Sequence, residues 1–193
     1  MSEQIMGRRR EDASEGYRTV SPTPMSLAQS LEIACCTDPG IVRSHNEDSI
    51  VSDASIGLVV LADGMGGYNA GEVASGMTTS VIATEMLQVL AERNPAEIDV
   101  ATGRSIGARL LLEQISKANA AVYHASKTQT QYSGMGTTLV TALFYNNGVT
   151  FAHIGDSRGY RLRDGILTQV TKDHSLLQEQ IDSGMITPEQ ARY

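Results

Sequence analysis

Three things are absent from this sequence: a long apolar run, a set of paired cysteines and an excess of positive charge. No apolar run approaches the ~20 residues that a membrane-spanning helix requires, and the N-terminus lacks the apolar segment of a signal peptide. The only cysteines are the neighbours Cys35 and Cys36, which would point to opposite faces of a strand, so a disulfide framework is not expected. These absences predict a cytoplasmic protein that makes no membrane contact.

The charge balance of the chain is acidic. It has 15 Lys and Arg residues against 22 Asp and Glu residues, a net charge of −7, which argues against nucleic acid as the main partner. With 193 residues and 41% hydrophobic composition, the sequence predicts one globular domain with a sizeable core. The oligomeric state is not indicated by the sequence.

The hydrophobic pattern divides the chain into a leader and a domain. Residues 1–30 are polar, include Pro22 and Pro24 and show no period, so we interpret them as a disordered or loosely attached leader. Residues 31–193 form the domain, in which strand-like and helix-like patterns follow one another. Strands are expected at 31–37, 49–53, 58–62, 137–145, 149–154, 159–163 and 166–170, and helices at 70–93, 104–127, 175–183 and from 187. This order predicts an α+β fold in which helices cover an antiparallel sheet.

The stretch Leu58–Gly67, LVVLADGMGG, is the most informative part of the sequence. A short apolar strand leads into Asp63, and a carboxylate at the end of a buried strand is costly unless it is paired or holds a metal. The simpler explanation is an Asp-Gly turn. Such turns join two strands, however, whereas the residues after Ala70 have a helical pattern. The stretch therefore predicts a strand, a glycine turn that allows close approach to a ligand, and a helix start.

Acidic residues end or flank three predicted strands, at Glu47 and Asp48, at Asp63 and at Asp156. Carboxylates gathered at strand ends, without cysteine, suit hard cations such as Mg²⁺ or Mn²⁺. Zinc is disfavoured because the four histidines show no paired ligand spacing. Arg43 lies just upstream of two of these acids. Its guanidinium either binds phosphate through two hydrogen bonds or forms a salt bridge with one of the acids, and the sequence leaves both open.

Four segments together resemble the metal-dependent serine/threonine protein phosphatases of type 2C, the PPM family, in their bacterial form. The segments are GIVR with NED within 40–48, ADGMGG at 62–67, GMGTT at 134–138 and IGDSR at 154–158, followed by DHS at 173–175. Each segment alone is weak evidence for the family, but the four together occur in the family's order. The resemblance covers about residues 31–193. It implies two packed antiparallel β-sheets flanked by helices, an αββα sandwich, with a two-metal centre at one end.

The resemblance also implies roles for the metal-binding residues. Asp63 is similar to the catalytic carboxylate that bridges both metals, and Gly64 would give its backbone carbonyl to one of them. Glu47 and Asp48 would bind that same metal directly or through its water. Asp156 resembles the acid that holds a third, weaker ion in bacterial members.

The implied activity is hydrolysis of phosphoserine or phosphothreonine in proteins by a metal-activated water, with two Mn²⁺ or Mg²⁺ ions and a third at the weaker site. Phosphorylated proteins would be the partners, and Arg43 would hold the substrate phosphate. The alternative is a non-catalytic domain of the same fold that binds a phosphoprotein or another partner.

Two departures from the family pattern matter. Many members outside bacteria have a histidine after the Asp-Gly pair, whereas this chain has Met65, which cannot donate a proton to the leaving oxygen. The family also supplies two later aspartates, in Ser-Asp-Gly and Asp-Asn motifs, and neither motif occurs before the last residue, Tyr193. We therefore expect the C-terminal part of the domain to be missing, and the chain to be nearly inactive and less stable than a longer form.

Overall fold

The computed structural model describes residues 27–67 and 69–192, so most of the predicted leader lies outside the described residues. The last four residues of the predicted leader, Leu27–Ser30, form the short helix α1. The remaining elements are β1 (Asp48–Asp53), β2 (Leu58–Met65), α2 (Ala70–Leu90), α3 (Ile106–Thr128), η1 (Thr130–Tyr132), β3 (Gly136–Thr137), β4 (Leu139–Tyr145), β5 (Gly148–Ile154), β6 (Tyr160–Arg163), β7 (Ile166–Gln169), α4 (Leu176–Asp182) and η2 (Gln190–Arg192). Within the described residues, no helix has both the length and the apolar character needed to span a bilayer.

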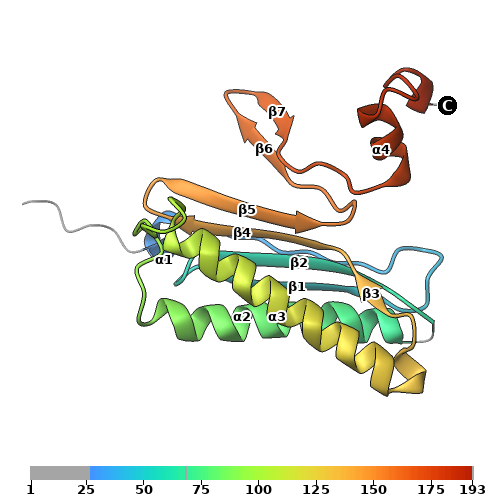
Figure 1. Cartoon of the computed structure of the whole chain (residues 1–193), viewed down its shortest axis with the longest axis horizontal. Coiled ribbons are helices and arrows are strands. Elements are labelled where there is room, and N and C mark those ends of the chain that lie inside the picture. The colour runs from blue at the N-terminus through green and yellow to red at the C-terminus, as the bar shows by residue number, and fades with distance from the viewer. Residues whose placement is uncertain (1–26, 68, 193) are drawn as a thin grey trace, which may run out of the picture.

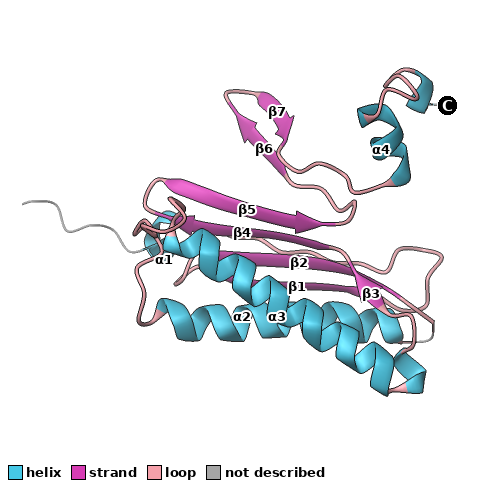
Figure 2. Cartoon of the chain, viewed as in Figure 1, coloured by secondary structure: helices cyan, strands magenta, loops and turns pink. Residues whose placement is uncertain are grey.

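Five strands form one antiparallel sheet, and the two long helices lie on one of its faces (Figure 1). The strand order is β1-β2-β4-β5, and the short β3, which precedes β4 in the chain, pairs with the end of β2 in the same register as β4. Figure 2 shows α2 and α3 side by side beneath this sheet. Strands β6 and β7 form a separate hairpin above β5. The predicted α+β class, with antiparallel sheets and flanking helices, is confirmed.

The alternation of β2 determines which side chains enter the core. Leu58, Val60 and Ala62 are fully buried on the helix-covered face. Asp63, the next residue of the strand, lies on the other face and is exposed. The core beneath the sheet is completed by apolar residues of α2, α3 and β4: Ile82, Met86, Leu110, Leu111, Ile115, Ala118, Leu139 and Leu143. Burial of β2 on one face therefore holds the acidic residue on the opposite, solvent-facing side.

The predicted helices and hairpins are largely confirmed. The expected stripe on α3, spaced alternately by four and three residues, is buried throughout: Leu111, Ile115, Ala118, Val122 and Ala125. Ser105 caps this helix by accepting a hydrogen bond from Ala108 N–H at 3.2 Å. The β6–β7 hairpin turns through Asp164 and Gly165, whose φ values of 52° and 76° suit a two-residue turn.

Three predictions of secondary structure are wrong. Residues 31–37 form no strand, because their alternating pattern finds no neighbouring strand to pair with among the described residues. The strand expected at 137–145 is divided at Thr138, because the Asp63 N–H donates to the Thr138 side-chain hydroxyl and not to the Thr138 carbonyl as a regular ladder would require. The helix expected from residue 187 is only the single 3₁₀ turn η2.

Candidate functional site

The register of the first hairpin brings two of the predicted acids side by side. Asp48 at the start of β1 is the direct cross-strand partner of Asp63 near the end of β2. Directly opposed residues of antiparallel strands have Cβ atoms about 4.5–5.5 Å apart, so the two carboxylates share one patch of the outer face. Two residues that are 15 positions apart in sequence thus become a pair at one end of the sheet.

The backbone of Asp63 is fixed by two threonines that follow the glycine-rich 134–136 turn. Thr138 N–H donates to the Asp63 carbonyl at 2.9 Å, and Asp63 N–H donates to Thr138 Oγ1 at 3.1 Å. Thr137 Oγ1 donates to the same Asp63 carbonyl at 3.0 Å. Thr138 Oγ1 also lies 2.8 Å from Ser157 Oγ, which connects this strand end to the loop that carries Asp156. The sequence suggested no such positioning role for either threonine.

Glu47 is positioned by close backbone packing that the sequence analysis missed. Gly64 N–H donates to the Glu47 carbonyl at 3.0 Å, and Ser75 Oγ donates to the same oxygen at 2.6 Å. A Cβ on Gly64 would lie 2.0 Å from the Gly71 carbonyl oxygen, so α2 begins directly against the end of β2. The available signal was Gly71 itself, since a glycine inside a helical pattern often marks a close approach.

Of the two interactions that the sequence left open for Arg43, the structure contains the salt bridge, and phosphate binding stays a prediction. Arg43 Nη1 lies 3.7 Å from Glu47 Oε2, four residues later, and 68% of its side chain is exposed. The same guanidinium lines the two hollows that border Asp63. An exposed ion pair of this length is weak, so the guanidinium remains available to an incoming anion.

Asp156 reaches the site from the loop after β5, and the 173–174 segment holds that loop. His174 N–H donates to the Gly155 carbonyl at 3.0 Å, and Gly155 N–H donates to His174 Nδ1 at 3.3 Å. Gly155 has a φ of +94°, a conformation that favours glycine. Two residues beyond Asp156, Arg158 forms a bidentate ion pair with Asp173. The predicted Asp-His-Ser motif therefore positions the third acidic site.

All of the predicted site residues line two adjoining hollows. One, of about 280 Å³, is bordered by Arg43, Glu47, Asp63, Gly64 and Asp156. The other, of about 230 Å³, is bordered by Arg43, Glu47, Asp48 and Asp63. Residues from three distant parts of the sequence thus meet at one end of the sheet.

The surroundings of Asp63 disfavour its charged form. Although Asp63 faces solvent, partial burial of its carboxyl raises its pKa, and the nearby negative charge of Asp48 raises that pKa further. The positive charge of Arg43 lowers the pKa of Asp63 in opposition, and Asp156 adds to the increase. A bound cation would stabilise the ionised form of Asp63.

The donor set fits a hard divalent cation by type and by charge. Carboxylate and backbone carbonyl oxygens, without cysteine or paired histidine, are the ligands of Mg²⁺ and Mn²⁺. Among residues 27–67 and 69–192, however, no three His, Cys, Asp or Glu side chains are already arranged to hold an ion. The acids gather at one place, and an ion would have to draw them together.

A family model described as protein phosphatase 2C matches residues 42–183, the part of the chain that contains every one of these site residues. The chain belongs to the protein phosphatase 2C family. Among curated relatives, the Ser/Thr protein phosphatase PstP of Mycobacterium tuberculosis is 41% identical over 166 residues, which is 83% of this chain and 28% of PstP. The Ser/Thr phosphatase stp of Listeria monocytogenes is 36% identical over 158 residues, 80% of this chain and 59% of stp.

Solved structures of bacterial phosphatases share the fold. The catalytic domain of PstP in complex with two manganese ions superposes with a TM-score of 0.66 at 40% identity, covering 80% of this chain and 60% of that one. Stp1 of Staphylococcus aureus has a TM-score of 0.68 at 35% identity, covering 88% of this chain and 64% of that one. The chain therefore spans less than two thirds of the length of these relatives.

Proposed function

We propose that this chain forms part of a protein phosphatase that hydrolyses phosphoserine and phosphothreonine in proteins. The observation that carries the proposal is the meeting of Asp48, Asp63 and Asp156 with Arg43 around adjoining hollows, in a chain of the protein phosphatase 2C family. Acidic groups for cations beside a guanidinium for phosphate are the two requirements of metal-assisted phosphate hydrolysis.

We assign each of these residues a role in that reaction. Asp63 would be the central carboxylate for both cations, and Glu47, Asp48 and the carbonyl of Gly64 would complete one site. Asp156 would hold a third, weaker ion. The raised pKa of Asp63 supports this assignment, because partial burial and then the charge of Asp48 disfavour its ionised form, and a bound cation would offset both effects.

Divalent cations, Mn²⁺ by analogy with the two-manganese complex of PstP or Mg²⁺ by the same oxygen donors, would supply an activated water and neutralise charge on the phosphoryl group. Arg43 orients the phosphate by hydrogen bonding to its oxygens. The acid that protonates the leaving oxygen is not Met65, since a thioether carries no proton to donate.

The direct test of the proposed function is Mn²⁺-dependent hydrolysis of p-nitrophenyl phosphate and of a phosphothreonine peptide. The complete phosphatase of which this chain forms part should hydrolyse both, and chelation with EDTA should stop the reaction. Asp63→Asn should remove turnover while the circular dichroism spectrum stays that of the wild type. Wild-type turnover by this variant would contradict the role of Asp63.

A second candidate is a non-catalytic domain that binds a phosphoprotein. One observation favours it: in the part of the chain that the structure describes, no three acidic or histidine side chains are preset for an ion. Under this alternative, a phosphopeptide binds through Arg43 with equal affinity in EDTA and in Mn²⁺, and no phosphate is released. Release of phosphate in the presence of Mn²⁺ would show that the protein is an enzyme and would exclude the non-catalytic alternative.

We further propose a cytoplasmic signalling role that opposes a protein kinase. Both cysteines are free and exposed, which suits a reducing compartment.

A further inference from the structure

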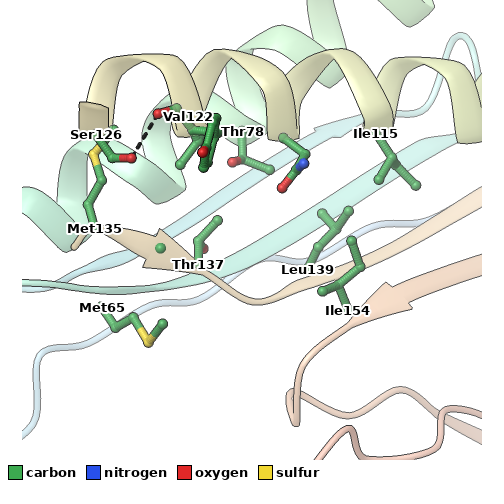
Figure 3. A pocket seen from close by; sticks show the side chains of 12 residues that line it. Met65, Thr78, Ile115, Val122, Ser126, Met135, Thr137, Leu139 and Ile154 are labelled. Atoms are coloured by element: carbon green, nitrogen blue, oxygen red, sulfur yellow. Dashed lines mark hydrogen bonds between the residues drawn. The ribbon is translucent and has the colours of Figure 1, made fainter. Parts of the chain in front are cut away.

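Thr138 lies between the two chain segments that carry the central and the third acidic residue. Leu139 and Ile154 are partners at the end of the β4–β5 ladder and lie side by side in Figure 3. The same register, continued by one residue, places Thr138 opposite Gly155, just before the third acid. On its other side Thr138 lies opposite Asp63, because β3 and β4 pair with β2 in one register. One residue therefore faces both acid-bearing segments.

The side chain of Thr138 lies on the face of the sheet that carries the acids. Successive strand residues point to opposite faces, and Thr137 lines a hollow of about 220 Å³ between α3 and the sheet (Figure 3). Thr138, the next residue, instead lines the hollow that contains Asp63 and Asp156. The side chain of Thr138 is therefore placed to contact the segments of both acids.

The hydroxyl of Thr138 connects these two segments by hydrogen bonds. Thr138 Oγ1 accepts from Asp63 N–H at 3.1 Å and lies 2.8 Å from Ser157 Oγ, one residue after Asp156. In a regular antiparallel ladder, Asp63 N–H would bond to a backbone carbonyl, which every residue type supplies. Here it bonds to a side-chain oxygen, so a single substitution at Thr138 can remove both this bond and the link to Ser157.

The methyl group of Thr138 supports the same loop by packing. A Cβ on Gly155 would lie 2.8 Å from Thr138 Cγ2 and 3.0 Å from Thr138 Cβ, so the backbone of Gly155 rests directly on this side chain. Thr138 thus contacts the residues on both sides of Asp156: Gly155 through its methyl group and Ser157 through its hydroxyl. The position of Asp156 relative to Asp63 therefore depends on one side chain.

We propose that Thr138 is a positioning residue that couples ion binding at Asp156 to ion binding at Asp63. This inference rests on the proposed phosphatase function and concerns how its ion sites act together. Coupling between two sites requires a connection through which a change at one alters the other. The chain Asp63 N–H, Thr138 Oγ1 and Ser157 Oγ is that connection, and it transmits a displacement of the Asp156 loop to the backbone of the central carboxylate.

The first test compares Thr138→Val, which keeps the branched shape without the hydroxyl, with Thr138→Ser, which keeps the hydroxyl. Without metal, hydrogen–deuterium exchange of the Asp63 amide, followed by NMR, should be about tenfold faster in Thr138→Val, because one hydrogen bond is lost. Isothermal titration calorimetry should give this variant a Kd for Mn²⁺ about tenfold higher than that of the wild type. Thr138→Ser should restore most of both properties, which a merely space-filling role of Thr138 would not produce.

Ser157→Ala distinguishes coupling from direct support of Asp63. This variant removes the link to the loop but leaves Thr138 Oγ1 as the acceptor of Asp63 N–H, so exchange of the Asp63 amide should stay that of the wild type. Mn²⁺ affinity should nevertheless fall. In an Asp156→Asn background the same substitution should have no further effect on Mn²⁺ affinity, because the link then has no carboxylate to position. This double-mutant cycle also decides the proposal if Thr138→Val does not fold.

Thr128→Val is the matched control, because Thr128 is exposed, its hydroxyl donates to the His124 carbonyl at 2.9 Å, and it borders neither acidic hollow. It should keep the wild-type Kd for Mn²⁺. Wild-type Mn²⁺ affinity in Thr138→Val, or an equal effect of Ser157→Ala with and without Asp156, would overturn the coupling. Absence of phosphate release by the complete phosphatase would overturn the proposed function instead, and the exchange and Mn²⁺ measurements would still decide the role of Thr138.

Discussion

A Cβ atom on Gly71 would lie 2.6 Å from Glu47 Oε1, so the carboxylate of Glu47 rests against the bare backbone at the start of α2. The same Cβ would lie 2.9 Å from the carbonyl carbon of Gly64, which cannot move without β2. The positions of two proposed metal-binding groups, the Glu47 carboxylate and the Gly64 carbonyl, therefore depend on the absence of a side chain at Gly71.

We expect Gly71→Ala to weaken Mn²⁺ binding by about tenfold or more, as loss of a group that supports metal ligands typically does. Isothermal titration calorimetry measures this. The matched control is Gly76→Ala on the same helix, where a Cβ would meet nothing within 4 Å. This control should keep the Mn²⁺ affinity and stabilise the protein by up to about 1 kcal/mol, because alanine is the better helix former. Unchanged metal affinity in Gly71→Ala would contradict the packing argument.

Asp63→Asn should separate metal binding from folding. Burial and the charge of Asp48 raise the pKa of Asp63, so its ionised form costs stability as the pH rises through that pKa. Without metal at pH 7, the asparagine variant should therefore melt at the same temperature as the wild type or higher. With Mn²⁺, only the wild type should gain thermal stability. An equal Mn²⁺-induced shift in both proteins, measured by differential scanning fluorimetry, would argue against Asp63 as a ligand.

Arg43→Ala should mainly weaken substrate binding, by about 1.5–3 kcal/mol if one charge-assisted hydrogen-bonded pair is lost. Steady-state kinetics with a phosphopeptide should show a raised KM, while Mn²⁺ affinity changes little, because the existing contact with Glu47 is long and exposed. A variant that loses metal affinity but keeps its KM would show that Arg43 serves Glu47 and not the substrate.

The Arg158–Asp173 ion pair should make stability depend on pH. Hydrogen bonding from Arg158 holds the pKa of Asp173 below its usual range, and the Asp173 side chain is only 13% exposed. This contribution is complete above the unfolded-state pKa of about 3.9 and is lost as the pH falls through the lower folded-state pKa. Asp173→Asn should lower the free energy of unfolding at pH 7 by up to about 1 kcal/mol, with the difference shrinking below pH 4 in urea titrations. A constant difference across this range would contradict the ion-pair explanation.

The sequence predicted the parts of the fold that depend on local pattern. The apolar stripe of α3 and the Asp164-Gly165 turn follow from spacing and backbone preference alone, and both were correct. Residues 31–37 show where this reasoning fails, because alternation describes a strand only if another strand is available to pair with it. The break at Thr138 was equally invisible, since it depends on hydrogen bonds to Asp63, 75 residues earlier.

For the site, the sequence and its family resemblance indicated the acids and Arg43 but not what positions them. Asp48 and Asp63 could be named from their places at strand ends, and the structure adds that they are cross-strand partners. Gly71 acts through the absence of a side chain and Thr137 through a hydroxyl that donates to the Asp63 carbonyl, and a single sequence does not show which distant backbone group either residue meets. The metal-binding roles themselves remain predictions that the experiments above test.

The pairing of Asp48 with Asp63 also bears on how the chain folds. The β1–β2 hairpin is local in sequence, and local contacts form early because little loop entropy opposes them. Like charges directly opposite each other destabilise such a hairpin. We therefore expect this repulsion to oppose formation of the hairpin early in folding. Divalent cations should accordingly accelerate refolding as well as stabilise the native state, which makes the folding rate itself a reporter of ion binding at this end of the sheet.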